Sequence, residues 1–254
     1  MGKWKKAVAA LAAVPMLMAL APAANAVESD PTDSSAAQRA LAAALKPNAK
    51  AAADSDLLAS LDFDNVAAGA TGTIVDDTTG TKATINGAAA VATSKDGTAA
   101  VRLGSGFWLN VTKSDDSAVL KGLDAVTISY DSKSASTNQG WSVFAAPNTN
   151  AQTYQQEHYL GVMDRTTSVN VERYNNAGKR DTTGNVSKDG LASQWRHVDL
   201  VIDEAASTLY IDGEQAATVA PADGASFAQL TDILGADGGV LQIGKANWVN
   251  GEYY

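Results

Sequence analysis

The chain has 254 residues, of which 45% are apolar, 6% aromatic and 19% charged. This composition supports one sizeable folded domain and excludes a wholly disordered chain. The formal net charge of −9 argues against a nucleic-acid or anionic-membrane binder, because neutralising phosphates needs clustered Lys and Arg. The chain has no cysteines, which excludes disulfides, cysteine-ligated metals and thiol nucleophiles.

Residues 1–26 have the pattern of a secretory signal peptide. Lysines in the first six residues precede an apolar run, and the small residues Ala24, Asn25 and Ala26 end the segment. Pro15 interrupts the apolar run, which favours a cleaved segment over a membrane span. We therefore expect cleavage after Ala26 and a secreted, extracellular product with no membrane association once the signal is removed.

Residues 27–56 are rich in Ala, Ser and Asp and predict a flexible leader. Only the stretch SSAAQRALAAALK has helical propensity, and Pro47 ends it. An amphipathic helix that binds a partner is the alternative interpretation. Its apolar face is nearly all alanine and would bury little area.

From residue 57 onward the apolar pattern changes to a period of two, which is typical of strands. In the clearest segment, Val198, Leu200 and Ile202 alternate with polar residues, and the next segment turns on Asp212-Gly213. The expected strands are 58–63, 99–103, 107–111, 125–130, 141–144, 168–174, 195–202 and 240–243. Short strands separated by turns, with one short helix at 226–233 in a connection, predict an all-β, two-sheet antiparallel sandwich.

Four phrases of this region resemble the laminin-G-like jelly-roll domains of the concanavalin-A-like lectin and glucanase superfamily. They are LLASLDFDN, LKGLDAVTISYDSKSASTNQGWSVFAA, SQWRHVDLVIDEAASTLYIDGE and LGADGGVLQIGKANWVNGEYY. The resemblance implies a concanavalin-A-like jelly roll over residues 57–254. It also implies that the strand which closes one sheet beside the first strand is missing, since in the family this strand follows the glycine-glutamate-aromatic segment. We therefore expect a truncated product or the amino-terminal part of a longer protein.

Domains of this kind commonly precede the catalytic domain of secreted bacterial glycosidases. This sequence is most similar to those attached to enzymes that release arabinose from plant polysaccharides. The resemblance therefore implies a glycoside hydrolase accessory domain, with a catalytic domain as a partner. A fold alone does not fix a function, so this attachment is an analogy.

The residues that a glycoside hydrolase of this fold would use are not found in the sequence. Glycoside cleavage needs two carboxyl groups about 5 Å apart, which the related glucanases place in a Glu-x-Asp-x-x-Glu arrangement. No such spacing occurs, and the glutamates that stand singly are Glu157, Glu172, Glu204, Glu214 and Glu252. The chain itself is therefore expected to have no catalytic residues.

Two other reaction types receive little support. Alginate-lyase relatives of the fold place Gln-x-His on one strand, a spacing that Gln156 and His158 reproduce, but their companion Arg-x-Glu-x-Arg strand is absent. A Ser-His-Asp triad is not indicated either. His158 and His197 are the only histidines, no nucleophile-elbow motif surrounds a serine, and His197 belongs to the structural Trp-x-His hairpin of the resembling family.

Carbohydrate binding needs only a flat ring against the C–H face of a sugar and polar groups for its hydroxyls. Each candidate ring has an alternative role in core packing, and Trp108 faces either the other layer or a groove because it alternates with apolar residues. The predicted carbohydrate-binding residues are Trp141, Tyr154, His158, Tyr159, Tyr174 and Trp248.

Calcium is the cofactor that the resemblance implies, since many such domains hold one and oxygen-rich loops suit this cation. Matching the family's Phe-Asp and its downstream turn aspartate gives Asp64 and Asp77 as the predicted ligands. The alternative is that both are turn carboxylates which bind backbone N–H groups.

The sequence thus predicts a secreted, non-catalytic module that binds or positions a polysaccharide or oligosaccharide. A structural spacer packed on a catalytic partner is the second hypothesis. A lyase or glucanase active in its own right is the third.

Overall fold

The computed structural model describes residues 7–10, 57–104, 106–134, 140–147, 158–166, 168–176, 179–187, 193–203, 206–219 and 229–247. For 7–10, 174–176, 179–187 and 219 it describes the backbone only. The chain divides into two compact units, of which the sandwich is the one made of Met1–Ala13 and Ser55–Tyr254. Most of the predicted signal peptide and the predicted leader lie outside the described residues.

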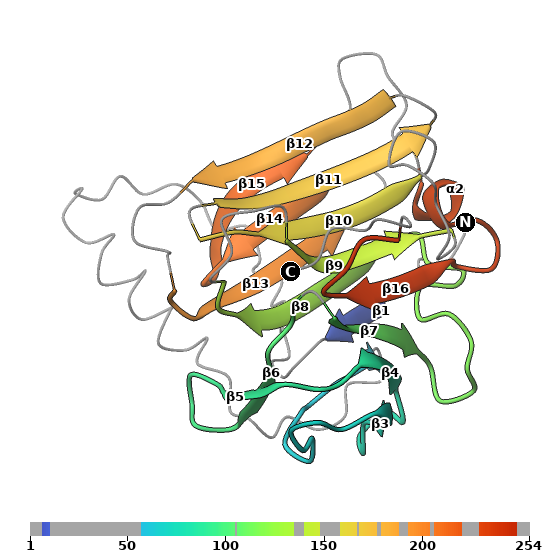
Figure 1. Ribbon diagram of the computed structural model, residues 1–254. Coiled ribbons are helices and arrows are strands. Elements are labelled where there is room, and N and C mark those ends of the chain that lie inside the picture. Colours follow the sequence, from blue (N-terminus) through green and yellow to red (C-terminus); the bar gives the residue numbers. More distant parts are fainter. Residues whose placement is uncertain are drawn as a thin grey trace, which may run out of the picture. The chain divides into compact units, whose positions relative to one another are not determined.

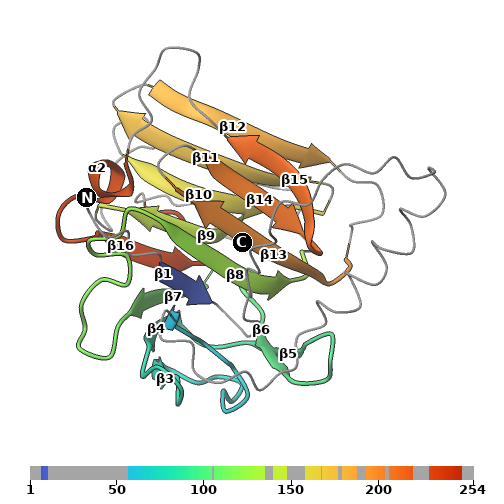
Figure 2. The same cartoon turned by 180° about the vertical axis from the view of Figure 1, so that it is seen from behind.

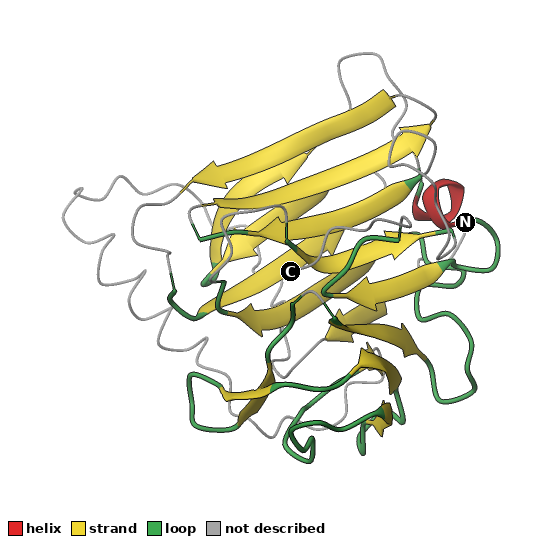
Figure 3. Cartoon of the chain, in the orientation of Figure 1, coloured by secondary structure: helices red, strands yellow, loops and turns green. Residues whose placement is uncertain are grey.

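The described strands form two large sheets and one small hairpin, shown as yellow arrows in Figure 3. The six-stranded sheet has the order β15 (Glu214–Val219), β14 (Ser207–Ile211), β13 (Arg196–Ile202), β8 (Val126–Ser132), β1 (Ala7–Ala10), β2 (Leu57–Ala59). The eight-stranded sheet has the order β12 (Lys179–Ser187), β11 (Ser168–Asn176), β10 (Tyr159–Asp164), β9 (Trp141–Ala146), β16 (Val240–Ile243), β7 (Phe107–Thr112), β4 (Lys82–Gly87), β3 (Gly72–Val75). The hairpin pairs β5 (Val91–Thr93) with β6 (Ala99–Val101).

The two large sheets lie face to face, with β13 to β15 behind β10 to β12 in Figure 1 and in front of them in Figure 2. One large core cluster contains residues of both sheets, such as Leu200 of β13 and Val162 of β10. This confirms the all-β, two-sheet sandwich predicted from the sequence. Strand β1 departs from the antiparallel pattern, since it pairs parallel with β2 and with β8.

The hairpins follow the local sequence closely. In β13 the core positions alternate with half-buried ones, as the period of two predicts. Asp212 and Gly213 have φ values of 53° and 82°, and they connect β14 to β15. Positive φ at both central residues is the geometry of a type I′ turn, whose twist matches that of paired strands, so the Asp-Gly pair fixes this hairpin.

The predicted helix is present as α2 (Leu230–Leu234), although residues 226–228 of the predicted range lie outside the described residues. Leu230, Ile233 and Leu234 are buried, and α2 contacts β9, β10 and β11. A helix of this length is a packed connection. None of the helices in the described ranges has the length and apolar character to cross a membrane.

A buried ion pair joins the two sheets. Arg196 of β13 donates through Nη2 to Asp164 of β10, and the two side chains are 1% and 0% exposed. The same nitrogen donates to the backbone oxygen of Arg165 at 2.8 Å, and the hydroxyl of Ser132 donates to Asp164. Buried charges need such partners because desolvation is costly, so this contact fixes how the sheets are aligned.

Candidate functional site

The face of the eight-stranded sheet that is turned away from the six-stranded sheet is here called the outer face. Leu109 of β7 and Leu160 of β10 belong to the core between the sheets, and their neighbours in sequence point to the other side because side chains alternate along a strand. From β4 to β11 the outer face carries Thr84, Asn86, Trp108, Asn110, Thr112, Gln242, Phe144, Tyr159, Met163, Asn170 and Glu172.

Three polar side chains form a row across neighbouring strands of the outer face. Thr84 of β4 lies opposite Asn110 of β7, which lies opposite Gln242 of β16. Gln242 Nε2 donates to Asn110 Oδ1 at 2.9 Å. Gln242 Oε1 is buried and accepts no hydrogen bond from the described residues. Gln242 is 2% exposed, so it supports Asn110 from below the surface, whereas Asn110 is half-buried and Thr84 is exposed.

A tryptophan lies beside this row. Trp108 precedes Asn110 by two residues on β7, is paired in register with Asn86 of β4, and is half-buried. Lys245 Nζ lies 5.3 Å from the centroid of the Trp108 ring, within the range of a cation–π contact. Burial lowers the pKa of Lys245. The contact holds the indole in position while part of its surface remains open to solvent.

Two of the predicted sugar-binding rings, Trp141 and Tyr159, are on this side of the sheet but are buried. They form a cluster with Phe144, in which the centroid of the Trp141 ring lies 5.0 Å from that of Phe144 and 5.7 Å from that of Tyr159. Trp141 and Tyr159 are 2% and 1% exposed. The Tyr159 hydroxyl donates to Glu172 Oε2 at 2.7 Å. Neither ring offers an open face, so their burial favours the alternative role in packing.

The other predicted carbohydrate-binding residues are not brought together with the polar row. Tyr174 is paired in register with Tyr159, and only its backbone is described. His158 donates through Nδ1 to the backbone oxygen of Asp232 in α2 at 3.2 Å. Tyr154 and Trp248 lie outside the described residues.

The two predicted calcium ligands, Asp64 and Asp77, have different surroundings in the structure. Asp64 Oδ1 accepts the backbone N–H of Ala99 at 3.0 Å, which is the turn-carboxylate role given as the alternative. Asp77 instead lines a cavity of about 230 Å³ that Asp64 does not line. A calcium ion takes six to eight oxygen ligands. Within the described ranges, no group of three or more His, Asp or Glu side chains is placed to hold a metal. Calcium binding therefore stays a prediction, and the arrangement around Asp64 does not fit it.

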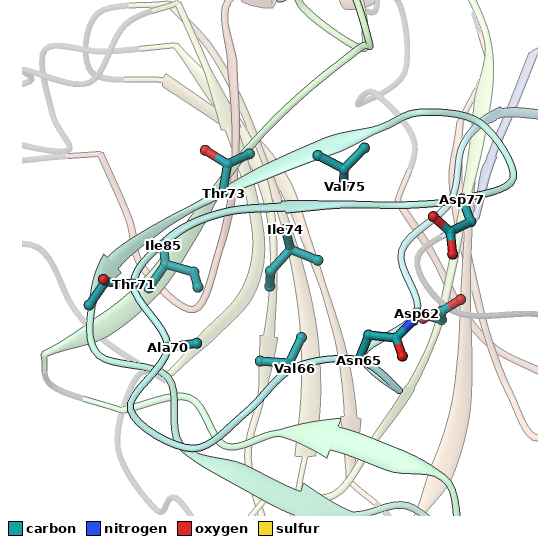
Figure 4. Close-up of a pocket in the computed structure, with 10 residues that line it drawn as sticks. All are labelled: Asp62, Asn65, Val66, Ala70, Thr71, Thr73, Ile74, Val75, Asp77 and Ile85. Atoms are coloured by element: carbon teal, nitrogen blue, oxygen red, sulfur yellow. The ribbon is translucent and has the colours of Figure 1, made fainter.

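The cavity lies between the segment after β2 and the hairpin of β3 and β4 (Figure 4). Asp62, Asn65 and Asp77 are grouped at one end, and the rest is lined by Thr71, Thr73 and apolar side chains such as Val66 and Ile74. Five of its ten lining residues are polar, but Asp62 and Asp77 are the only carboxylates among them, so the lining holds fewer charged oxygen ligands than a calcium ion usually takes.

The six-stranded sheet carries a charged cluster that the sequence did not indicate. Ser129 Oγ lies 3.0 Å from His197 Nε2, and His197 Nδ1 lies 2.9 Å from Asp131 Oδ1. These contacts follow the connectivity of a serine nucleophile, a histidine base and an orienting carboxylate. Asp199 lies 3.2 Å from His197 Nε2, and Lys95 Nζ lies 2.6 Å from Asp131 Oδ1.

The electrostatics of this cluster exclude the role of a general base for His197. Hydrogen bonds to Asp131 and to Asp199 raise the pKa of His197 to about 9. At neutral pH the ring is protonated and has no lone pair with which to accept a proton from Ser129, whose hydroxyl also donates to Asp199. The cluster is therefore an ion-pair network. The sequence shows that Ser129 alternates with Asp131 and that His197 alternates with Asp199. It does not show that β8 pairs with β13, which brings the four side chains together.

No protein-family model matches this chain, and no curated protein matches it either. Solved structures do resemble it. Domain 4 of AbnA, a GH43 extracellular arabinanase from Geobacillus stearothermophilus, in complex with arabinotriose, has 16% identity and a TM-score of 0.49 over 70% of this chain and 79% of that one. The CBM40 of the Ruminococcus gnavus IT-sialidase has 22% identity and a TM-score of 0.40 over 50% and 67%. Domains LG4-5 of the mouse laminin α1 chain have 13% identity and a TM-score of 0.33 over 48% and 28%.

The laminin-G-like sandwich suggested by the sequence is thus represented among these structures. All three similarities have TM-scores below 0.5, and the strand pairing of this chain itself defines its two-sheet architecture.

Proposed function

We propose that this chain is a non-catalytic module that binds a polysaccharide or oligosaccharide on the outer face of its eight-stranded sheet. The observation that carries the proposal is the half-buried ring of Trp108 beside the exposed Thr84 and the half-buried Asn110, whose amide Gln242 holds by a hydrogen bond.

This arrangement has the two elements that sugar recognition requires. A flat, partly exposed aromatic ring covers the apolar C–H face of a furanose or pyranose. Side-chain amides and hydroxyls, placed about 5 Å apart on neighbouring strands, match the spacing of sugar hydroxyls and can both donate and accept hydrogen bonds. Because these groups lie on paired strands and not on loops, they are held in fixed positions before the ligand arrives, which lowers the entropy cost of binding.

Binding without cleavage agrees with the positions of the described glutamates. Glu172 accepts the hydroxyl of Tyr159 on the eight-stranded sheet, whereas Glu214 begins β15 on the other sheet. These two carboxylates belong to different layers and do not form the closely spaced pair that glycoside hydrolysis needs. We therefore propose a binding role for the chain, and the resemblance of its sequence supports a separate catalytic domain as the partner.

The sequence supports a location, a ligand class and a parent enzyme for the proposed module. Residues 1–26 support export, so we propose an extracellular location. The similarity of the phrases around residues 195–214 and 234–254 to domains attached to arabinose-releasing enzymes supports plant arabinan, arabinoxylan or arabinogalactan as the ligand and a glycoside hydrolase as the parent enzyme.

The test is retention of the purified chain on affinity gels that contain each of these polysaccharides, with the variant Trp108→Ala. We expect the variant to bind about tenfold more weakly, which corresponds to roughly 1.4 kcal/mol of stacking energy. The matched control is Tyr210→Ala, which removes a half-buried ring from β14 on the other sheet and should leave binding unchanged. Equal loss in both variants, or none in either, would contradict the assignment of the binding face.

The structural-spacer hypothesis is favoured by the burial of Trp141 and Tyr159. It predicts no retention on any polysaccharide while the Trp141→Ala variant loses stability. Thermal unfolding of that variant, recorded beside the affinity gels, separates the two functions.

A further inference from the structure

The cavity beside the β3–β4 hairpin has an apolar floor and a polar rim. Its volume is about 230 Å³, roughly that of eight molecules of liquid water. Ile85 of β4 is buried in the main core, and Val66, Ala70 and Ile74 are half-buried and pack against this core. The five polar residues of the lining are all exposed. A ligand chain that lies on the floor therefore removes apolar surface from water, which favours binding.

Hydrogen bonds tie the two walls of the cavity together at both ends. One wall is the segment after β2, and the other is the β3–β4 hairpin (Figure 4). At the start of the segment, the backbone N–H of Ser60 lies 3.1 Å from Thr79 Oγ1 and 3.2 Å from Thr81 Oγ1. At its end, the N–H of Ala89 donates to the backbone oxygen of Ala70 at 2.9 Å. The walls are thus held in place before a ligand arrives, which lowers the entropy cost of binding.

One end of the cavity carries negative charge that no described residue neutralises. The carboxylates of Asp62 and Asp77 lie at this end beside the amide of Asn65 (Figure 4). Asp62 Oδ1 accepts the backbone N–H of Asp64 at 3.3 Å. The ion pairs among the described residues include neither Asp62 nor Asp77. Because like charges repel each other, a cation that contacts both carboxylates is favoured at this end.

The lining as a whole excludes several ligand classes. None of the ten lining residues is aromatic, so the cavity lacks a ring on which a sugar could stack. A calcium ion takes more oxygen ligands than these carboxylates supply, and it would leave the apolar floor uncovered. An anion would be repelled by both carboxylates. The lining fits a ligand with a cationic head and an apolar chain.

We propose that this cavity binds a linear aliphatic primary amine with about five carbon atoms, a length set by the volume. Such an amine is protonated at neutral pH. Its ammonium group donates to Asp62, Asp77 and the amide oxygen of Asn65, and its chain lies on the apolar floor against Ile74. Thr71 lies at the end opposite the carboxylates (Figure 4), where its hydroxyl can bond a second polar group of the ligand.

The test is an NMR titration of the full chain with labelled isoleucine methyl groups. The ligand is 5-amino-1-pentanol. Its matched control is 1,5-pentanediol, which has the same chain and a hydroxyl group in place of the ammonium group. We expect the amine to shift the methyl signals of Ile74 and Ile85 in a saturable way, and to bind about tenfold more tightly than the diol at low salt. No saturable shift with the amine, or equal affinity for the diol, would overturn the proposal.

Variants separate the two carboxylates from the overall negative charge of the chain. Asp62→Asn and Asp77→Asn should each weaken binding of the amine about threefold and leave binding of the diol unchanged. The matched control is Asp64→Asn, because Asp64 does not line the cavity and asparagine keeps the oxygen that accepts the N–H of Ala99. Equal loss in all three variants would overturn the proposal, since binding would then depend on net charge alone. The inference does not rest on the proposed glycan binding, because Trp108 does not line the cavity.

Discussion

The ion-pair network around His197 should make the stability of this protein depend on pH in the alkaline range. Asp131 and Asp199 lie 2.9 Å and 3.2 Å from the ring nitrogens of His197 and raise its pKa from 6.5 to about 9. In the unfolded chain the histidine has no such partners. A raised pKa in the folded state contributes stability that is fully present below pH 6.5 and is lost as the pH rises through about 9.

The magnitude follows from the size of the shift. Each pKa unit corresponds to about 1.36 kcal/mol, which sets an upper limit of about 3 kcal/mol for the fully coupled ring. The His197 side chain is 18% exposed and Asp131 is 20% exposed, and contact with solvent weakens such pairs. We therefore expect about 1–2 kcal/mol of the free energy of unfolding to depend on the charge of His197.

The assay is urea unfolding of the wild type and of His197→Gln at pH 6.0, 7.5 and 9.5. Glutamine retains hydrogen-bonding groups but does not titrate. The difference in free energy of unfolding between the two proteins should shrink by about 1–2 kcal/mol between the lowest and the highest pH. The control His158→Gln removes the chain's other histidine. A wild-type minus His197→Gln difference that stays constant over this range would refute the assignment of a protonated His197.

Two further predictions concern packing. A Cβ added at Gly161 would lie 2.5 Å from Cζ3 of Trp141 and 3.1 Å from Cδ2 of Phe144, so Gly161→Ala should destabilise the protein by about 1–3 kcal/mol and change its tryptophan emission; an unchanged melting temperature would contradict the position of the Trp141 ring. Replacing Arg196 by Met leaves Asp164 charged and buried and should cost about 3–5 kcal/mol in urea unfolding, whereas the double variant Arg196→Met, Asp164→Leu should recover most of that loss. If the double variant were as unstable as the single one, the ion pair would not be the source of the effect.

Local signals in the sequence were sufficient for much of the sandwich. The alternation of Val198, Leu200 and Ile202 predicts β13, and the Asp212-Gly213 pair predicts the turn that follows β14, because both depend on neighbouring residues only. The face on which a ring lies is less predictable. Val143 pairs with Val162, but Met163 pairs with Trp141, so the register shifts by one residue at the start of β9. This bulge turns the Trp141 side chain to the outer face, where it packs with Phe144 and Tyr159. No residue type in 141–144 predicts the bulge.

The polar row and the charged cluster both depend on pairing between distant segments. Asn110 and Gln242 are 132 residues apart in sequence, and their amides meet only because β7 and β16 are neighbours. The alternation of Trp108 with Leu109 predicts that its ring faces either the other layer or a groove. What the sequence alone could not supply was the register that brings these side chains to one place.

The distribution of charge between the two outer surfaces bears on the kind of glycan that the proposed binding face would accept. On the six-stranded sheet the titratable groups His197, Asp131 and Lys95 are already paired with one another, so that surface has little capacity to bind a ligand by charge. On the other sheet Thr84, Asn86, Trp108 and Asn110 of the outer face are neutral, and Lys245, which lies over the Trp108 ring, is buried. A net charge of −9 repels a polyanionic glycan at long range. The hydroxyl groups of a neutral glycan are not repelled by this charge, and they can form hydrogen bonds with the side chains of Thr84 and Asn110. If the outer face binds a glycan as proposed, we therefore expect it to bind an uncharged glycan more strongly than a polyuronate or a sulfated glycan.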